Sequence, residues 1–151
     1  MQLLAEFANK QVWYRELARP FPFVAPFPGE PYVCILFIQD PGITAAEQAE
    51  LSDQIVRSGC RYAVCTGHIC SSWDDSIDMA YLATEVDFQP RDETFVMTSW
   101  HDEEPLEGVI FFGLFNTGFD DYAFSKVSDS IARARCGVAS PDRCGHRFAS
   151  A

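Results

Sequence analysis

The sequence predicts an α/β fold in which a small, mostly parallel sheet is covered by helices on both faces. Short apolar runs alternate with segments of helical periodicity, and 48% of the 151 residues are hydrophobic. Such alternation is typical of parallel sheets with right-handed crossovers. We expect a three-layer arrangement with three or four strands in a flavodoxin-like or truncated Rossmann-like order, built as a single α/β domain over residues 1–151.

The first 31 residues are predicted to form an N-terminal helix followed by a strap. Apolar residues such as Leu3, Phe7 and Leu17 recur at helical spacing over residues 3–18. Five prolines follow between residues 20 and 31, which excludes a helix or a central strand there. Because phenylalanines interleave with these prolines, we expect a Pro/Phe-rich strap that lies on the domain.

The expected α/β core spans residues 32–127. Its apolar runs predict four strands, at residues 32–38, 61–65, 94–100 and 122–127. Capping residues and breakers predict three helices, from Thr44 to Gly59, from Ser71 or Ser72 to about Val86, and from Pro105 to Phe115. The last of these helices is apolar nearly all round, which predicts deep burial. Residues 128–151 are expected to hold a short helix, at 129–135, and an irregular tail.

Negative charge is concentrated in one part of the chain. The sequence has 22 acidic and 11 basic residues, which gives a net charge of −11. Residues 39–104 contain fourteen of the acids and three of the bases, so they account for the whole net charge. Phosphate backbones repel such a surface, which argues against direct nucleic-acid binding. A basic protein partner or a cation would be attracted, although an acidic surface also favours solubility.

Cysteine usage and the N-terminal residues predict a cytoplasmic protein without membrane contact. The chain does not begin with a basic segment followed by an apolar stretch and a cleavage site, and no apolar run is long enough to span a bilayer. Of the six cysteines, Cys34 and Cys65 lie in strand-like runs, which favours reduced thiols over disulfides. The oligomeric state is left open.

Three loops are expected to form the functional edge of the sheet, because ligands of such sheets bind beyond the carboxyl ends of the strands. We call the loops at residues 39–42, 66–75 and 99–104 the acidic rim; they contain two histidines, two tryptophans, one loop cysteine and six acids. The catalytic candidates are Cys70, Asp74 and His101. The binding candidates are Asp40, Ser72, Trp73, Asp75, Trp100, Asp102 and Glu103.

These candidates also have structural interpretations. Asp74 and Asp75 follow two serines at a predicted helix start, where serine caps the helix and carboxylates complement its dipole. His101 beside Asp102 suits proton transfer or metal binding, yet the pair also precedes an acid-rich helix start. Cys70 next to a helix N-terminus is expected to have a lowered pKa, which suits a nucleophile.

No metal or cofactor motif is complete. Cysteine and histidine recur as C-x2-H-x-C at residues 65–70 and as C-x7-C-x-H at residues 136–146, and neither spacing matches a standard zinc signature. The sequence contains no glycine-rich phosphate loop, no nucleophile elbow, no HExxH and no C-x-x-C. We therefore assign no metal ligands and leave the cofactor open.

Two segments of the chain resemble a small family of bacterial proteins classed only as a domain of unknown function. The segments are CSSWDDSIDMAYL at residues 70–82 and FVMTSWHDEEPLEGVIFF at residues 95–112. The family shares a Cys-Ser-Ser-Trp-Asp-Asp stretch and a Thr-x-Trp-His-x-x-Glu-Pro-Leu stretch, which fall here at 70–75 and 98–106. The resemblance covers roughly residues 32–127. It implies that both stretches belong to a site and adds no reaction.

Two functional hypotheses follow. The first is a protein-binding module, such as an immunity or inhibitor protein or an accessory factor of a bacterial defence or toxin system, in which exposed Trp73 and Trp100 beside carboxylates bind a basic partner. The second is a small hydrolase in which His101 transfers protons and Cys70 is the nucleophile. A divalent cation in the hydrolase would be held by Asp40, Asp74, Asp75 and Asp102. The absence of a catalytic signature favours binding.

Overall fold

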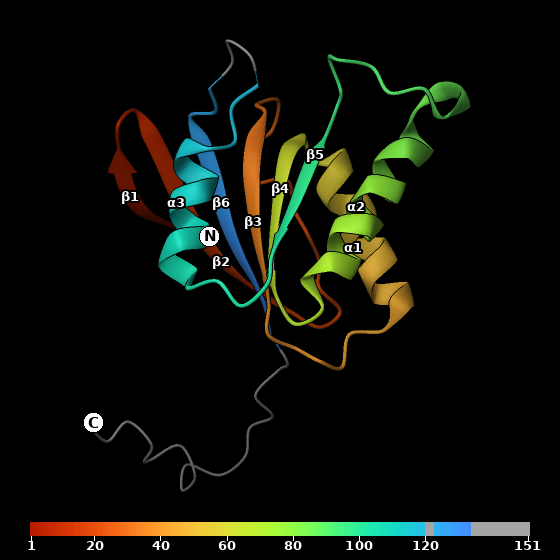
Figure 1. Cartoon of the computed structure of the whole chain (residues 1–151), viewed down its shortest axis with the longest axis horizontal. Coiled ribbons are helices and arrows are strands. Elements are labelled where there is room, and N and C mark those ends of the chain that lie inside the picture. The colour runs from red at the N-terminus through yellow and green to blue at the C-terminus, as the bar shows by residue number, and fades with distance from the viewer. Residues whose placement is uncertain (120–122, 134–151) are drawn as a thin grey trace, which may run out of the picture.

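The computed structural model describes residues 1–119 and 123–133, which form a six-stranded mixed sheet with three α-helices (Figure 1). The strand order is β1-β2-β6-β3-β4-β5. Neighbouring strands are parallel except β1 and β2, which are antiparallel. The strands are β1 (Gln2–Phe7), β2 (Lys10–Ala18), β3 (Tyr32–Ile38), β4 (Cys60–Gly67), β5 (Met97–His101) and β6 (Lys126–Arg133).

The sheet is larger than the three or four strands predicted, and its order differs from the predicted one. The five parallel strands, numbered along the chain, run 1-5-2-3-4 across the sheet, since β6 lies between β2 and β3. A flavodoxin-like sheet has the order 2-1-3-4-5, and a Rossmann sheet starts 3-2-1. The mixed α/β class is therefore confirmed, whereas the flavodoxin-like or Rossmann-like order is not.

The N-terminal segment is a β-hairpin and not the predicted helix over residues 3–18. Ala8 and Asn9, between β1 and β2, have φ angles of 49° and 64°. Two residues with positive φ form the tight turn whose twist matches antiparallel strands. In β2, Val12 packs beneath α3 (Leu106–Phe115) while Leu17 packs on the opposite face, so its apolar residues serve both faces of the sheet. Because apolar residues of β2 lie on both faces, they do not alternate strictly along the sequence, and their spacing resembles that of a helix.

Strand β6 is the second departure from the prediction, which placed a strand at 122–127 and a helix at 129–135. The strand covers Lys126–Arg133 and pairs with β2 on one side and β3 on the other. Polar residues fill its middle, and the buried hydroxyls of Ser128 and Ser130 lie 3.1 Å apart as hydrogen-bond partners. This central strand was not predicted because it lacks the continuous apolar run from which strands such as β3 were predicted. The remainder of the predicted helix and the tail, including Cys136, Cys144 and His146, lies outside the described residues.

Helices lie on both faces of the sheet (Figure 1). Helix α1 (Ala45–Arg57) and helix α2 (Cys70–Thr84) cover one face, and α3 covers the other. A 3-10 turn (Val86–Phe88) follows α2. The strap shares the face of α1 and α2, because Phe21 and Phe27 are buried in the same apolar cluster as Leu51, Ile55 and Trp73. Within the described residues, no helix combines the length and apolar composition that a membrane crossing requires.

The predicted N-cap is confirmed for helix α1 and is wrong for helix α2. At α1, Thr44 and Glu47 form the predicted capping box: Glu47 N–H donates to Thr44 Oγ1 over 3.2 Å, and Thr44 N–H donates to Glu47 Oε2 over 2.9 Å. At α2, neither serine caps the helix; the N-cap is Ile69, which has a left-handed backbone and makes no side-chain cap. Ser72 instead accepts a hydrogen bond from Gln48 of α1.

Helix α3 is less buried than its apolar sequence predicts. Only Val109 and Gly113 are buried within it, whereas Phe111 and Phe115 are 59% and 44% exposed. A single helix on a sheet face hides only the side that touches the sheet, so the outer rings remain at the surface. Gly113 lies so close to β3 that a Cβ there would be 2.6 Å from Cδ1 of Ile35.

Candidate functional site

The start of α2 and the end of β5 lie together, as the acidic rim requires. Strands β4 and β5 are parallel with Thr66 opposite His101, and the Thr66 hydroxyl donates to the His101 carbonyl over 3.0 Å. The Cys70 thiol lies against the His101 backbone and near the charge of Asp102, since both affect its pKa. Residues 66–75 and 99–104 therefore form one continuous edge, which was predicted from the rule for parallel sheets.

The sheet nevertheless separates the side chains of this edge into two groups. Thr98 donates to Asp78 of α2 over 2.9 Å, so it faces α2, and Trp100 shares that face because side chains alternate along a strand. His101 faces the other side, where its ring centroid lies 4.5 Å from that of Phe112 in α3. The imidazole is thus across the sheet from Trp73, a residue of α2 that is buried in the apolar cluster shared with α1. The structure does not bring the imidazole of His101 onto the face of Asp74.

His101 is held by two hydrogen bonds and is only 8% exposed. Its Nδ1 lies 3.0 Å from Oε2 of Glu104, and its Nε2 lies 3.2 Å from the hydroxyl oxygen of Ser99. The sequence pointed to Asp102 as the orienting carboxylate, whereas the structure gives that place to Glu104. Spacing could have suggested this partner, because Glu104 is three residues further along the turn that follows β5. With both ring nitrogens engaged, the imidazole ties β5 to the turn that leads into α3.

Cys70 lacks the properties of a nucleophile. It is 2% exposed, and burial together with the negative charge of Asp102 raises the pKa of its thiol, even though backbone hydrogen bonds from His101, Cys70 itself and Ser71 act in the opposite direction. The expected lowering of this pKa by the helix N-terminus is therefore wrong. The four described cysteines, which are Cys34, Cys60, Cys65 and Cys70, are free and buried.

Two carboxylates of α2 meet the same hydroxyl of β5. Burial raises the pKa of Asp74, which is 6% exposed and whose Oδ1 has no hydrogen-bond partner among the described residues. Burial also raises the pKa of Asp78, one helical turn later. The Thr98 hydroxyl opposes both shifts by hydrogen bonding. Asp78 is not among the residues predicted for the site, although its four-residue spacing from Asp74 places both on one side of a helix.

The two tryptophans of the rim have different environments. Trp73 is 1% exposed and belongs to the core, so the expectation that it is an exposed anchor is wrong. Trp100 is 56% exposed on edge strand β5 and matches that expectation. Ile69, just before α2, and Met79, on the outer side of α2, are exposed as well, at 54% and 62%.

Asp40 contributes to local structure more than to the surface charge. It is 6% exposed, and its Oδ1 accepts the backbone N–H of Gly42 over 2.8 Å. Its Oδ2 lies 3.3 Å from Nη2 of Arg19, whose Nε also lies 3.0 Å from Glu47. This arrangement joins the end of β2 to the loop between β3 and α1 and neutralises the Asp40 charge locally.

The remaining acids of the rim are exposed. They are Asp75, Asp102, Glu103 and Glu104. The nearby bases are occupied: Arg91 pairs with Glu85 over 2.8 Å, and Arg61 donates to the carbonyls of Phe95 and Asp92. Among residues 1–119 and 123–133, no three His, Cys, Asp or Glu side chains are grouped so that they could hold a metal ion.

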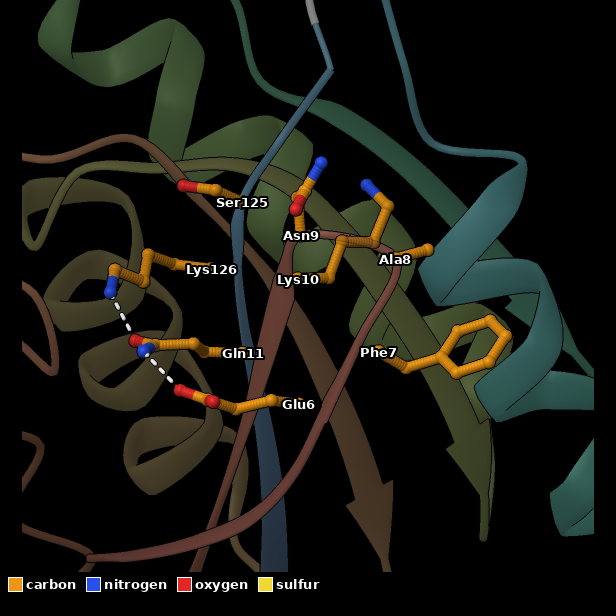
Figure 2. A pocket seen from close by; sticks show the side chains of 8 residues that line it. All are labelled: Glu6, Phe7, Ala8, Asn9, Lys10, Gln11, Ser125 and Lys126. Atoms are coloured by element: carbon orange, nitrogen blue, oxygen red, sulfur yellow. Dashed lines mark hydrogen bonds between the residues drawn. The ribbon is translucent and has the colours of Figure 1, made fainter.

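A cavity of about 430 Å³ lies at the opposite end of the sheet, beside the β1–β2 turn (Figure 2). Its polar lining is paired internally: Lys126 donates to Gln11, and Gln11 donates to Glu6 over 2.7 Å. Lys10 donates to the carbonyl of Phe124 over 2.6 Å. Because these groups already have hydrogen-bond partners within the protein, we favour the acidic rim over this cavity as the functional site.

Fold and site together define a mixed α/β protein with an acidic edge and one exposed tryptophan, Trp100, on the edge strand β5. The chain belongs to the family DUF7684, a domain of unknown function, which matches residues 12–129. The match begins within β2 and ends within β6, so it reaches every parallel strand and leaves β1 outside. No curated protein and no solved structure matches the chain.

Proposed function

We propose that this chain is a protein-binding module whose acidic rim binds a basic partner. The observation that carries the proposal is Trp100, an indole that is 56% exposed and lies on a strand next to the exposed carboxylates Asp102 and Glu103. Tryptophan is among the side chains enriched at the energetic centres of protein interfaces, and its ring also attracts the cations of lysine and arginine. Surrounding carboxylates steer a basic partner toward it and speed encounter.

The groups that catalysis would use are less well placed. The Cys70 thiol is buried and has a raised pKa, and His101 has both ring nitrogens in hydrogen bonds. In the described part of the chain, the hydrolase hypothesis is supported only by Asp74, a buried carboxylate with a raised pKa and one oxygen that has no hydrogen-bond partner there. A carboxyl group whose pKa is raised by burial is a candidate proton donor to a leaving group. Without a nucleophile or an assembled set of metal ligands beside it among the described residues, binding is the better supported function.

The same features suggest a biological setting for the module. An acidic binding edge complements the basic surfaces of proteins that act on nucleic acids, such as nuclease toxins. We therefore assign the chain a role as a cytoplasmic immunity or inhibitor protein, or as an accessory factor of a bacterial defence or toxin system. The bacterial origin rests on the resemblance of residues 70–82 and 95–112 to a bacterial family.

Partner capture with charge-reversed variants tests the proposal. The double variant Asp102→Lys/Glu103→Lys changes the rim, and Glu30→Lys/Glu50→Lys makes the same charge change at exposed acids elsewhere. From an extract of the native host at low salt, the wild type and the control are expected to retain one stoichiometric basic protein that the rim variant loses. Capture of the same protein by both double variants, or of no stoichiometric protein by the wild type, would contradict the proposal.

A further inference from the structure

We propose that the basic partner binds by strand addition, with an extended segment that pairs with the open edge of β5 and carries basic residues at alternate positions. This inference rests on the proposed function and names the form of partner that the rim takes. It follows from three features of β5: an unpaired backbone edge, two chemically different side-chain rows, and carboxylates at both ends of the strand.

The first feature is the backbone edge. Strand β5 is the last strand of the sheet, and in the part of the chain that the structure describes it pairs with β4 alone, from Met97 opposite Tyr62 to His101 opposite Thr66. At every second residue of β5, the N–H and C=O groups therefore point away from the sheet, where the described residues provide no strand partner. Such an edge is the surface on which another extended chain adds by backbone hydrogen bonds.

The second feature is the chemistry of the two faces of β5. On the face toward α2, Thr98 donates a hydrogen bond to the carboxylate of Asp78, and Trp100, two residues further along the strand, shares that face. On the other face, Met97 is 37% exposed and Ser99 is partly buried. An added strand places its side chains alternately on these two faces, about 5 Å from their neighbours on β5. Lysine or arginine fits the face with the indole and the carboxylates, while small or apolar residues fit the face with Met97.

The third feature is the charge around the strand. Exposed acids precede β5, at Asp92 and Glu93, and follow it, at Asp102 and Glu103. The other open edge, β1, lies in a neutral part of the chain, because residues 1–31 contain three acids and three bases. A basic segment is therefore attracted to β5 and not to β1, although both strands offer an unpaired edge.

Two peptides of identical composition test the inference with the full chain. One alternates lysine and threonine over ten residues, and the other has five lysines followed by five threonines. Calorimetry at low salt is expected to show the alternating peptide binding at least about tenfold tighter, because only it presents one basic face as a strand. Amide exchange followed by NMR is expected to slow at every second residue of β5 and to be unchanged at β1.

Equal affinities would overturn strand addition while leaving the rim as a site based on charge alone. Slowed exchange at β1 in place of β5 would also overturn it. If neither peptide binds, the inference fails, and the partner-capture experiment alone then judges the proposed function.

A pair of variants adds a check on the named edge. Trp100→Lys places a cation on the face expected to receive the basic residues and is predicted to weaken the alternating peptide about tenfold or more. Val24→Lys makes a matched change at a strap residue that is 76% exposed, and it is predicted to leave the affinity nearly unchanged. Equal weakening by both variants would mean that overall charge, and not the β5 edge, governs binding.

Discussion

At the scale of single residues, Asp129 is a buried carboxyl group whose ionisation opposes folding. It lies in the centre of β6, is 7% exposed, and its Oδ1 has no hydrogen-bond partner among the described residues. Burial raises its pKa from 3.8 to about 6. Because the folded state then holds a proton more tightly than the unfolded chain, this residue contributes most to stability below pH 4 and loses that contribution as the pH rises through 6.

Replacement of this carboxyl by an amide tests the argument. Asp129→Asn is expected to raise the free energy of unfolding at pH 7 by roughly 1–3 kcal/mol, since each unit of pKa shift corresponds to about 1.4 kcal/mol. The gain is expected to shrink toward pH 4, where the aspartic acid is protonated in the folded state. Urea denaturation at both pH values measures it. A variant that is less stable than the wild type at pH 7 would show that the charged carboxylate has a stabilising partner.

Cys70 gives a second prediction at this scale. Because its thiol is buried and its pKa is raised, we expect it to react slowly with iodoacetamide at pH 7 in the native protein. Mass spectrometry of the labelled protein is expected to find Cys70 unmodified, together with Cys34, Cys60 and Cys65, until urea is added. Rapid native labelling of Cys70 would contradict this environment and would favour the hydrolase hypothesis.

At the scale of elements, the position of α3 depends on a glycine. A Cβ at Gly113 would be 2.6 Å from Cδ1 and 2.9 Å from Cγ1 of Ile35, a fully buried residue of β3. Gly113→Ala is therefore expected to cost about 1–3 kcal/mol by overpacking, as measured by urea denaturation.

Gly108 provides the matched control in the same helix. No atom of the described residues lies within 4 Å of a Cβ placed there, so Gly108→Ala is expected to stabilise the protein by up to about 1 kcal/mol through helix propensity. If both alanines stabilise the protein, Ile35 can move aside and α3 is not seated on β3 as closely as described.

The elements differ in how well the sequence predicts them. A prediction succeeds where the pattern of apolar and polar residues matches the burial of that element, and it fails where the pattern does not. Strand β3 and helix α1 were predicted closely because an unbroken apolar run and a capping box each have one structural meaning. The sequence of the N-terminal hairpin resembles that of a helix because β2 places apolar groups on both faces. Strand β6 was missed because Ser128, Asp129 and Ser130 occupy its centre, and only the neighbouring strands explain how those groups are accommodated.

The candidate site could be predicted in part: its loops follow from the sequence, but the directions of its side chains do not. The rule for parallel sheets correctly joined residues 66–75 to residues 99–104. It could not assign side chains to faces, because that depends on which residues of β5 point toward α2, and a shift of one residue exchanges them all. Trp100 and His101 are adjacent in sequence and lie on opposite sides of the sheet for this reason.

At the scale of the whole molecule, the two edges of the sheet are electrostatically different. The acids lie around β4, β5 and α2, whereas the β1–β2 hairpin belongs to a neutral segment. This polarity favours one orientation for a basic partner. It also predicts that binding weakens steeply with salt, because exposed charges are screened beyond about 10 Å at 0.1 M ionic strength.

The place of β6 in the sheet has a consequence for how the protein is made. The last described strand enters between β2 and β3, so a nascent chain cannot complete its sheet until residue 133 has left the ribosome. Until then it carries a hairpin and a separate group of three strands, with no strand to join them. A premature stop before residue 126 would remove the centre of the sheet and leave two exposed strand edges inside an unfinished core, a state that chaperones must shield from aggregation.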